Sequence, residues 1–206
     1  MKKLILKKYK YIIGVDEVGR GPLAGPVAVG VVKLKVEILK ATTKWGKGFR
    51  DSKKLSAKAR EAWLVKINEA MGDGWLDYAV AFVSASVIDK KGLSYSIRTA
   101  IWKALGAIEH DTKETKVLLD GALRAPSRYL YQETIIKGDE KELAIALASI
   151  VAKVARDKRM VALAKKFPEY GFEKHKGYGT RAHYKALKKH GITKHHRKSF
   201  LKNIGR

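Results

Sequence analysis

Residues 11–32, YIIGVDEVGRGPLAGPVAVGVV, contain two apolar segments joined by a turn rich in glycine and proline. Ile12 to Val15 predict a buried strand that ends on Asp16 and Glu17, two charges that need a compensating partner at such a position. Val27 to Leu34 predict a second strand. The acids and the turn are therefore expected at one rigid strand-turn-strand corner.

The turn places a basic side chain between two glycines, Gly19-Arg20-Gly21. Because glycine lacks a Cβ, the backbone there can adopt φ > 0 and approach a ligand closely. Pro22 and Pro26 stiffen the same turn. An anion such as phosphate is the ligand expected at this position.

The remainder of the chain predicts three further strands and four helices. The helices are expected over about residues 57–70 with Ser56 as N-cap, 92–110, 141–166, and 181–190 closed by Gly191. The strands are expected at 75–83, 116–119 and 129–136. The first of these would complete an antiparallel meander, and the second follows a crossover helix. The pattern predicts an α/β fold with a five-stranded mixed sheet flanked by helices.

Asp120 follows the apolar strand expected at 116–119 and precedes Gly121. An Asp-Gly pair after a strand is most often an ordinary turn. An acid at the carboxyl end of a strand reached through a crossover helix also lies where open α/β sheets bind their ligands. From these residues alone, Asp120 is either a turn residue or a site residue that faces Asp16 from the next strand.

Asp157 interrupts an apolar stripe on the helix expected at 141–166. The apolar members are spaced by four and then three residues: Leu143, Leu147, Ile150, Val154, Val161 and Ala164. A carboxylate in that series is expected at a core position, where it costs several kcal/mol unless a cation compensates it. Two compensations are open, a bound metal ion or a salt bridge to Lys153 one turn earlier.

The chain is strongly basic. Its 206 residues include 44 Lys and Arg against 20 acids, a formal net charge of +24, which favours a phosphate backbone as the partner. A ribosome-type binding protein or adaptation to an unusual environment would give the same balance. The absence of cysteine excludes disulfides and thiolate metal sites, and no segment is long and apolar enough to span a membrane. We expect a cytoplasmic protein.

The tail from residue 165 to 206 differs in composition from the rest. It contains 13 Lys and Arg, two acids, and five of the six histidines, interleaved with aromatic residues. This mixture is typical of surfaces that hold phosphates and stack on sugars or bases. The histidines have no cysteine beside them and no repeated ligand spacing, which argues against zinc. We expect a small helical lobe over the active-site edge of the sheet.

The corner motif DEVGRGPLAGPV, residues 16–27, resembles the signature of the type 2 ribonucleases H, bacterial ribonuclease HII in particular. The related ribonuclease HIII lacks the arginine found here as Arg20 and has a glutamate at the position of Asp157, so both residues favour HII. Further blocks resemble the family: DSKKL at 51–55, ALASIVAKVARDKRM at 146–160, HKGYGT at 175–180 and HRKSF at 196–200.

The resemblance implies a ribonuclease H-like catalytic domain over 1–165 and a basic C-terminal substrate-binding lobe over 166–206. It implies four acids that are both catalytic residues and metal ligands: Asp16, Glu17, Asp120 and Asp157. It implies substrate binding by Gly19, Arg20, Gly21, Ser52, Lys53 and Tyr178. Tyr178 would pack against the sugar at the ribose-to-deoxyribose step. An all-oxygen donor set favours Mg²⁺ or Mn²⁺, with two ions in the substrate complex.

The activity implied is endonucleolytic. The enzyme would hydrolyse the RNA strand of RNA–DNA hybrids and nick 5′ of ribonucleotides embedded in duplex DNA, leaving 5′-phosphate and 3′-hydroxyl ends. The expected partners are these nucleic acids and possible contact with a sliding clamp, and the expected state is a monomer. Two rivals remain: an exonuclease or resolvase of ribonuclease H-like architecture, which has no reason to carry the Gly-Arg-Gly corner, and a non-catalytic RNA-binding protein.

Overall fold

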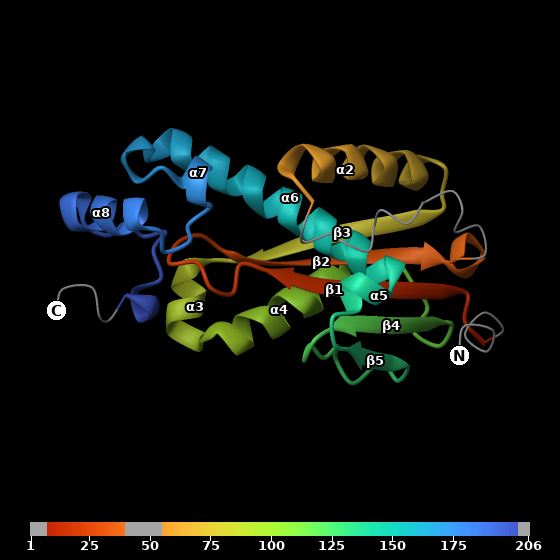
Figure 1. Ribbon diagram of the computed structural model, residues 1–206. Helices are drawn as coiled ribbons and strands as arrows, with labels where there is room; N and C mark the ends of the chain where they lie inside the picture. Colours follow the sequence, from red (N-terminus) through yellow and green to blue (C-terminus); the bar gives the residue numbers. More distant parts are fainter. Residues whose placement is uncertain (1–7, 40–54, 202–206) are drawn as a thin grey trace.

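The computed structural model describes residues 8–39 and 55–201 (Figure 1). Its strands form one sheet in the order β3-β2-β1-β4-β5. They are β1 (Tyr11–Val18), β2 (Val27–Lys35), β3 (Leu76–Val83), β4 (Thr115–Asp120) and β5 (Gln132–Ile135). β1 pairs with β2, and β2 with β3, in antiparallel fashion, whereas the β1–β4 and β4–β5 pairs are parallel. The predicted five-stranded mixed sheet is confirmed.

Seven α-helices and one 3₁₀ segment of the described chain surround the sheet or follow it. They are η1 (Val36–Leu39), α2 (Ala57–Gly72), α3 (Ala85–Lys91), α4 (Leu93–Gly106), α5 (Gly138–Lys141), α6 (Leu143–Lys166), α7 (Phe172–His175) and α8 (Arg181–His190). Two short 3₁₀ turns, η4 (Pro168–Tyr170) and η5 (Lys198–Phe200), lie in the C-terminal part. No described helix is long and apolar enough to cross a bilayer.

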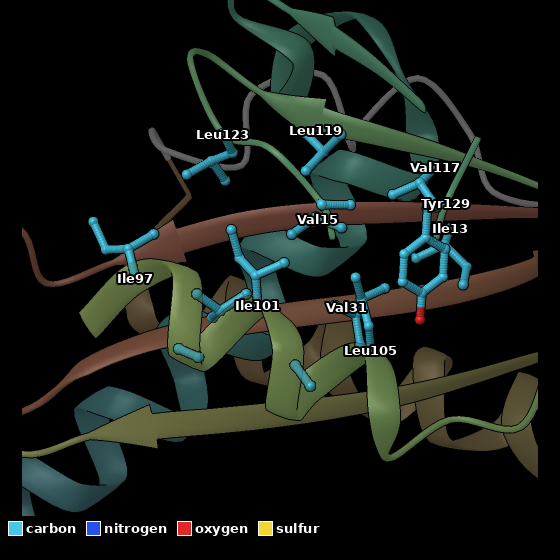
Figure 2. Close-up of a cluster of buried hydrophobic side chains, with 14 of the residues drawn as sticks. Ile13, Val15, Val31, Ile97, Ile101, Leu105, Val117, Leu119, Leu123 and Tyr129 are labelled. Atoms are coloured by element: carbon cyan, nitrogen blue, oxygen red, sulfur yellow. The ribbon is translucent and has the colours of Figure 1, made fainter. Parts of the chain in front are cut away.

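Two hydrophobic cores form because strand side chains alternate between the two faces of the sheet. Ile12 packs toward α2 and α6, whereas its neighbour Ile13 packs toward α4. Figure 2 shows the second core, where Ile97 and Ile101 of α4 pack against the sheet. The helix predicted at 92–110 is present with the shorter bounds of α4.

Glycines in β1 and β2 allow α6 to lie close against the centre of the sheet. A Cβ added at Gly14 would collide with the carbonyl group of Ala144, and one added at Gly30 would collide with the carbonyl oxygen of Ala148. This contact holds α6 across the two strands that lead into the corner turn. It sets the position of every side chain that α6 directs toward the site.

The C-terminal part packs on the far end of α6 through a third apolar cluster (Figure 1). The cluster joins Leu23 of the corner turn, Met160 of α6, Phe172 of α7 and Leu187 of α8. The helix predicted at 181–190 is present with those bounds, and the Thr180 side chain accepts a hydrogen bond from the amide of His183 at its N-terminus. The division into domains at residue 165 stays a prediction.

The apolar stripe predicted on α6 is confirmed up to Val154 and at Ala164, but it is wrong at Val161, which is 38% exposed. The buried row in this part of the helix is Ala152, Arg156, Met160 and Ala164, each four residues after the last. α6 is 24 residues long, and over that length positions spaced alternately four and three residues apart drift away from the row of side chains that faces the sheet. Asp157 therefore lies at the edge of the buried face and not in it.

Two elements differ from expectation for local reasons. α3 was not predicted, because a seven-residue helix directly after a strand has little periodicity to detect. β5 begins at Gln132, three residues later than expected. The preceding segment is a turn from which Tyr129 enters the second core, and the Gln132 side chain donates back to the Tyr129 carbonyl oxygen.

Candidate active site

A pocket of about 370 Å³ lies where the carboxyl ends of β1 and β4 meet the corner turn. The strand register places Val15 beside Leu119, so the acids that follow in each strand lie at the same edge of the sheet. The residues lining the pocket are Asp16, Glu17, Val18, Gly19, Arg20, Gly21, Arg60, Asp120, Ser149, Lys153 and Tyr178. Of the candidate site residues that the structure describes, only Asp157 is outside this set.

Asp16 and Glu17 form the inner wall of the pocket. Asp16 is only 3% exposed, and its Oδ1 accepts a hydrogen bond of 2.8 Å from the amide of Glu17. Glu17 Oε1 accepts a hydrogen bond of 3.0 Å from Arg20 Nη1. Burial raises the pKa of Glu17, the ion pair with Arg20 opposes this shift, and the charge of Asp120 adds to it. The pocket thus concentrates negative charge that a cation would stabilise.

Asp120 is the last residue of β4, and Gly121 after it adopts φ of 58° in a turn. Its Oδ1 accepts a hydrogen bond of 2.7 Å from the amide of Gly138, where α5 begins. The structure therefore brings together both alternatives that the sequence left open. A turn does follow Asp120, and the carboxylate reaches the pocket that contains Asp16.

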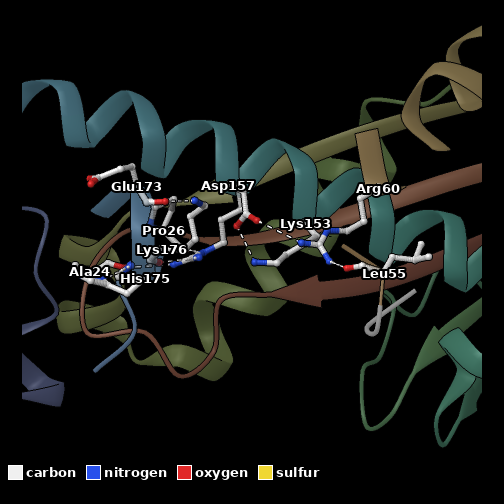
Figure 3. A network of polar contacts seen from close by, with 11 residues as sticks. Ala24, Pro26, Leu55, Arg60, Lys153, Asp157, Glu173, His175 and Lys176 are labelled. Carbon is white, nitrogen blue, oxygen red and sulfur yellow. Dashed lines mark hydrogen bonds and ion pairs between the residues drawn. The ribbon is translucent and has the colours of Figure 1, made fainter. Parts of the chain in front are cut away.

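Asp157 lies beside the pocket and is held by two cations (Figure 3). Its Oδ1 is 2.7 Å from Lys153 Nζ, one helical turn earlier, and its Oδ2 is 3.9 Å from Arg60 on α2. The side chain is 18% exposed and lines an adjoining pocket of about 340 Å³, which shares Arg60 with the first. The salt bridge considered from sequence is present. The structure places three of the predicted acids in one pocket and the fourth next to it.

The donor chemistry of these acids fits a hard divalent cation, because all four offer only carboxylate oxygens. Within residues 8–39 and 55–201, no three acidic or histidine side chains converge closely enough to form a metal-binding group. The side chains instead satisfy one another, with Lys153 and Arg20 supplying positive charge next to the carboxylates. Asp16, Glu17 and Asp120 line one pocket and could hold an ion there, whereas Asp157 lines the adjoining pocket and is paired with Lys153.

Two buried arginines lie behind the corner turn, and no sequence pattern marks either one. Arg156 and Arg197 both have 0% exposure. Arg156 donates to the carbonyl oxygens of Ala24, Pro26 and Lys176. Arg197 donates to those of Gly19, Arg20 and Gly25. In a chain with 44 basic residues, nothing distinguishes these two until their burial is known.

Tyr178 stands on a loop that is tied to the corner turn. Its ring is 42% exposed at the pocket, and the Gly177 carbonyl oxygen before it accepts hydrogen bonds from the amides of Leu23 and Ala24. A Cβ at Gly177 would collide with the Ala24 carbonyl oxygen, and its φ is 86°. Glycine at this position therefore lets the tyrosine loop contact the turn directly.

A chain of neutral histidines supports the same loop. The Thr193 amide donates to Nδ1 of His196, so Nε2 carries the proton of this ring and donates to Nε2 of His183 at 3.1 Å. His183 Nδ1 in turn donates to the Tyr178 carbonyl oxygen at 2.9 Å. Burial, with the neighbouring His183, lowers the pKa of His196 to about 4, and burial also lowers that of His183. These histidines have a structural role, because they support the loop that carries Tyr178.

Ser52 and Lys53, predicted to bind substrate, lie outside the residues that the structure describes. Arg60 and Ser149 line the pocket but were not predicted. Arg60 is in the first turn of an amphipathic helix, where a basic side chain carries no particular signal. Its carbonyl partner is Leu55, the residue before the N-cap of α2.

The fold and the pocket define the class of protein: a nuclease of ribonuclease H-like architecture, with acids at the carboxyl ends of two adjacent parallel strands. The family model of ribonuclease HII matches residues 13–203. The chain therefore belongs to the ribonuclease HII family, whose members cleave the RNA of RNA–DNA hybrids, and it is a ribonuclease.

Relatives and solved structures agree with this assignment. Ribonuclease HII of Clostridioides difficile is 44% identical over 96% of this chain and 72% of its own length. Ribonuclease HII of Caldicellulosiruptor bescii is 44% identical over 98% of this chain and 92% of its own length. The crystal structure of ribonuclease H2 from Pyrococcus horikoshii has a TM-score of 0.74, with 25% identity over 94% of this chain and 96% of that one.

Two further solved structures share the fold. Ribonuclease HII of Archaeoglobus fulgidus, in its complex with PCNA, has a TM-score of 0.71 and 25% identity, covering 95% of this chain and 97% of that one. Bst-RNase HIII, in complex with Mn²⁺, has a TM-score of 0.64 and 18% identity over 98% of this chain and 73% of that one, a likeness of fold alone.

Proposed function

We propose that the chain is an endonuclease that hydrolyses the RNA strand of RNA–DNA hybrids and nicks 5′ of single ribonucleotides in duplex DNA. The products carry 5′-phosphate and 3′-hydroxyl ends. One observation carries the proposal: a single pocket contains Asp16, Glu17 and Asp120 together with the Gly19-Arg20-Gly21 backbone and the ring of Tyr178. Groups suited to phosphoryl transfer and groups suited to reading a sugar therefore face the same space.

The acids are proposed as ligands of Mg²⁺ or Mn²⁺. When bound, two such ions would supply an activated water and stabilisation of the leaving oxygen in an in-line displacement. Asp16 and Asp120 face each other from adjacent strands, Glu17 adds a third carboxylate, and Asp157 joins from the rim after it releases Lys153. The Mn²⁺ complex of Bst-RNase HIII, which shares the fold, supports this choice of ion.

The protein's own contribution to selectivity is recognition of the sugar. The 2′-hydroxyl is the group that distinguishes ribose from deoxyribose, and it can both donate and accept hydrogen bonds. Arg20 and Gly21 are exposed and line the pocket, and the Tyr178 ring lies beside Gly21, where an added Cβ would be 3.9 Å from Cε1 of the ring. We assign the ribose to the backbone and the following deoxyribose to Tyr178, with Ser52 and Lys53 as further contacts.

The surroundings of the site favour a long nucleic acid as substrate. The net charge of +24 attracts a phosphate backbone, and the region from 166 onward is proposed as the lobe that holds the duplex. The PCNA complex of the Archaeoglobus fulgidus enzyme supports contact with a sliding clamp. We propose that the protein acts as a monomer in the cytoplasm.

A gel assay tests the proposal. A labelled DNA duplex with one internal ribonucleotide is incubated with Mg²⁺, and the products are resolved beside size markers. We expect one internal nick on the 5′ side of the ribonucleotide. Shortening from the ends would indicate an exonuclease, and a duplex that is shifted on a native gel but intact would indicate a non-catalytic binding protein. The same reaction without metal ion is the control.

A further inference from the structure

The two peptide groups of the Gly19-Arg20-Gly21 turn are held from behind by one side chain. Arg197 Nη2 donates to the Gly19 carbonyl oxygen at 2.6 Å, and Nη1 donates to the Arg20 carbonyl oxygen at 2.8 Å. Its Nε donates to the Gly25 carbonyl oxygen at 3.1 Å, across the turn. A planar guanidinium with a fixed fork of donors therefore sets the rotation of both peptide planes.

This orientation determines where the amides of the turn point. In a trans peptide the C=O of one residue and the N–H of the next lie on opposite sides of the same plane. Since both carbonyl groups face Arg197 in the interior, the N–H groups of Arg20 and Gly21 face outward. Both residues are exposed and line the acidic pocket. Within the part of the chain that the structure describes, neither N–H has a hydrogen-bond partner.

Arg156 provides an internal comparison, because it is equally buried and also binds only carbonyl oxygens. Its partners include Ala24 and Lys176, and the amides of those two peptide groups are already used inside the protein. The Gly25 amide donates to the His195 carbonyl oxygen, and the Gly177 amide donates to His175 Nδ1. Arg156 thus holds two peptide groups whose N–H is already bonded, whereas two of the three peptide groups held by Arg197 have an open N–H, and the third, Gly25-Pro26, has none.

Arg197 is itself held in place from several sides. Its own amide donates to the Leu23 carbonyl oxygen, and the amides of Lys198 and Ser199 after it donate to the carboxylate of Asp89 on α3. Burial and the nearby charge of Arg156 lower the pKa of Arg197 to about 10, which leaves the guanidinium charged at neutral pH. The HRKSF block at 196–200, whose role the sequence did not reveal, contains this anchor.

We infer that Arg197 is a positioning residue for ribose recognition, which fixes the Arg20 and Gly21 amides as a preorganised donor pair aimed into the pocket. The inference rests on the proposed reading of ribose by this turn. Donors that are already oriented need no reorganisation when the ligand binds, and they discriminate against a ligand that lacks the matching acceptor. Arg197 acts through the backbone and touches no substrate atom.

The test compares two conservative variants, Arg197→Lys and Arg156→Lys, for their preference for ribose. Binding of a duplex with one ribonucleotide and of the same all-deoxy duplex is measured by fluorescence anisotropy in EDTA, so that neither is cleaved. We expect the wild type to prefer the ribonucleotide about tenfold, as for one or two hydrogen bonds. Lysine cannot fork to both carbonyl groups, so Arg197→Lys is expected to lower the ratio below about threefold. Arg156→Lys is expected to keep most of it.

The outcomes separate the inference from the function it rests on. An unchanged ratio in Arg197→Lys, or an equal loss in both variants, would overturn the positioning role, since a structural arginine would behave in that way. A wild type without preference would overturn the reading of ribose itself, and the role of Arg197 with it. The melting temperature of each variant is measured alongside.

Amide hydrogen exchange on the wild type gives a second measurement that needs no variant. We expect the Arg20 and Gly21 amides to exchange freely in the unbound protein, because they point to solvent. The ribonucleotide duplex should slow their exchange several-fold more than the all-deoxy duplex does. Amides that are already protected in the free protein would show that they point inward, and the inference would be wrong.

Discussion

The corner turn has two sides that treat charge in opposite ways. On the pocket side, charged side chains pair with other charged side chains that are partly exposed, as Glu17 does with Arg20 and Asp157 with Lys153. On the rear side, Arg156 and Arg197 are fully buried and bind only backbone carbonyl oxygens. Partners on the pocket side can be exchanged for a ligand, whereas those on the rear side cannot. The side chains proposed to act on the substrate thus lie on one face of the turn, and the side chains that hold its backbone in place lie on the other.

Burying two charged arginines on the rear side costs free energy unless their hydrogen bonds are kept, and this requirement makes the rear side rigid. A buried cation without a carboxylate partner is tolerated only if several hydrogen bonds replace its hydration. Each buried arginine donates three such bonds to backbone carbonyl oxygens. Removing one of these arginines would remove three hydrogen bonds at once. The pocket side carries no such constraint and is free to reorganise around ions.

Asp16→Asn is the substitution on the pocket side that we expect to reduce cleavage most. The amide oxygen preserves the acceptor for the Glu17 amide, so the fold should persist, but the charge of a buried carboxylate in the pocket is lost. We expect cleavage of an RNA–DNA hybrid to fall about a thousandfold or more, since several kcal/mol of charge stabilisation disappear. Single-turnover cleavage rates measure the effect. Unchanged activity with an unchanged melting temperature would contradict the assignment of Asp16.

The scaffold beneath the turn is tested by Gly14→Ala. The new methyl group would meet the backbone of Ala144 in α6, so helix and sheet must separate. We expect the free energy of unfolding to fall by about 3 kcal/mol, at the upper end for overpacking. Gly106→Ala in α4 is the matched control, because no atom lies within 4 Å of its added Cβ. There we expect a gain of about 0.5–1 kcal/mol in urea unfolding.

The sequence predicted the pocket side better than the rear side, and the reason is physical. Acids at the end of an apolar strand conflict with their surroundings, which made Asp16 and Glu17 visible, whereas Asp120 stayed open between a turn and a site residue until the family resemblance was considered. The bounds of the second strand and of the 181–190 helix followed from alternation and a glycine stop, and they agree with β2 and α8. Such signals depend only on neighbours along the chain.

The rear side depends on contacts between distant residues. Arg197 meets Gly19 across 178 positions, and no local pattern marks an arginine as buried. The four-then-three spacing of apolar residues predicted a core position for Asp157. The face of α6 that is turned to the sheet instead follows the row that contains Arg156 and Met160. The family resemblance implied that Asp157 is a site residue, whereas its salt bridge with Lys153 was predicted from spacing alone. Whether it binds metal stays a prediction.

The histidine chain behind Tyr178 makes the rear side sensitive to acid. Because the pKa of His196 is lowered to about 4 in the folded protein, the unfolded chain takes up a proton between about pH 6.5 and 4 that the folded protein does not. This contribution to stability is present above about pH 6.5 and is lost as the pH falls to about 4. His183, which faces His196, shifts in the same direction.

The variant His196→Asn isolates this contribution, because the amide oxygen still accepts from the Thr193 amide and does not titrate. Between pH 6.5 and 4 we expect the wild type to lose about 1–2 kcal/mol more stability than the variant, allowing for relaxation of the buried pocket. Denaturant unfolding at several pH values measures the difference. The exposed His190→Asn should follow the wild-type curve. Parallel curves for wild type and His196→Asn would contradict the neutral histidine chain.

The smallest expected effect concerns the exchange of partners on the pocket side. Lys153 is 2.7 Å from Asp157 and lines the acidic pocket, so its ammonium competes with any metal ion for that carboxylate. In Lys153→Met the competitor is absent, and we expect the Mg²⁺ concentration for half-maximal cleavage to fall about two- to fivefold. The change is modest because Arg60 remains 3.9 Å from Asp157.

Lys166→Met removes the same charge from the last residue of α6, away from the pocket, and controls for net charge. A rise in the Mg²⁺ requirement of Lys153→Met, or an equal fall in both variants, would show that the ion pair is part of the fixed scaffold. Lys153 and Asp157 would then belong with the rigid rear side of the turn and not with the adaptable pocket side.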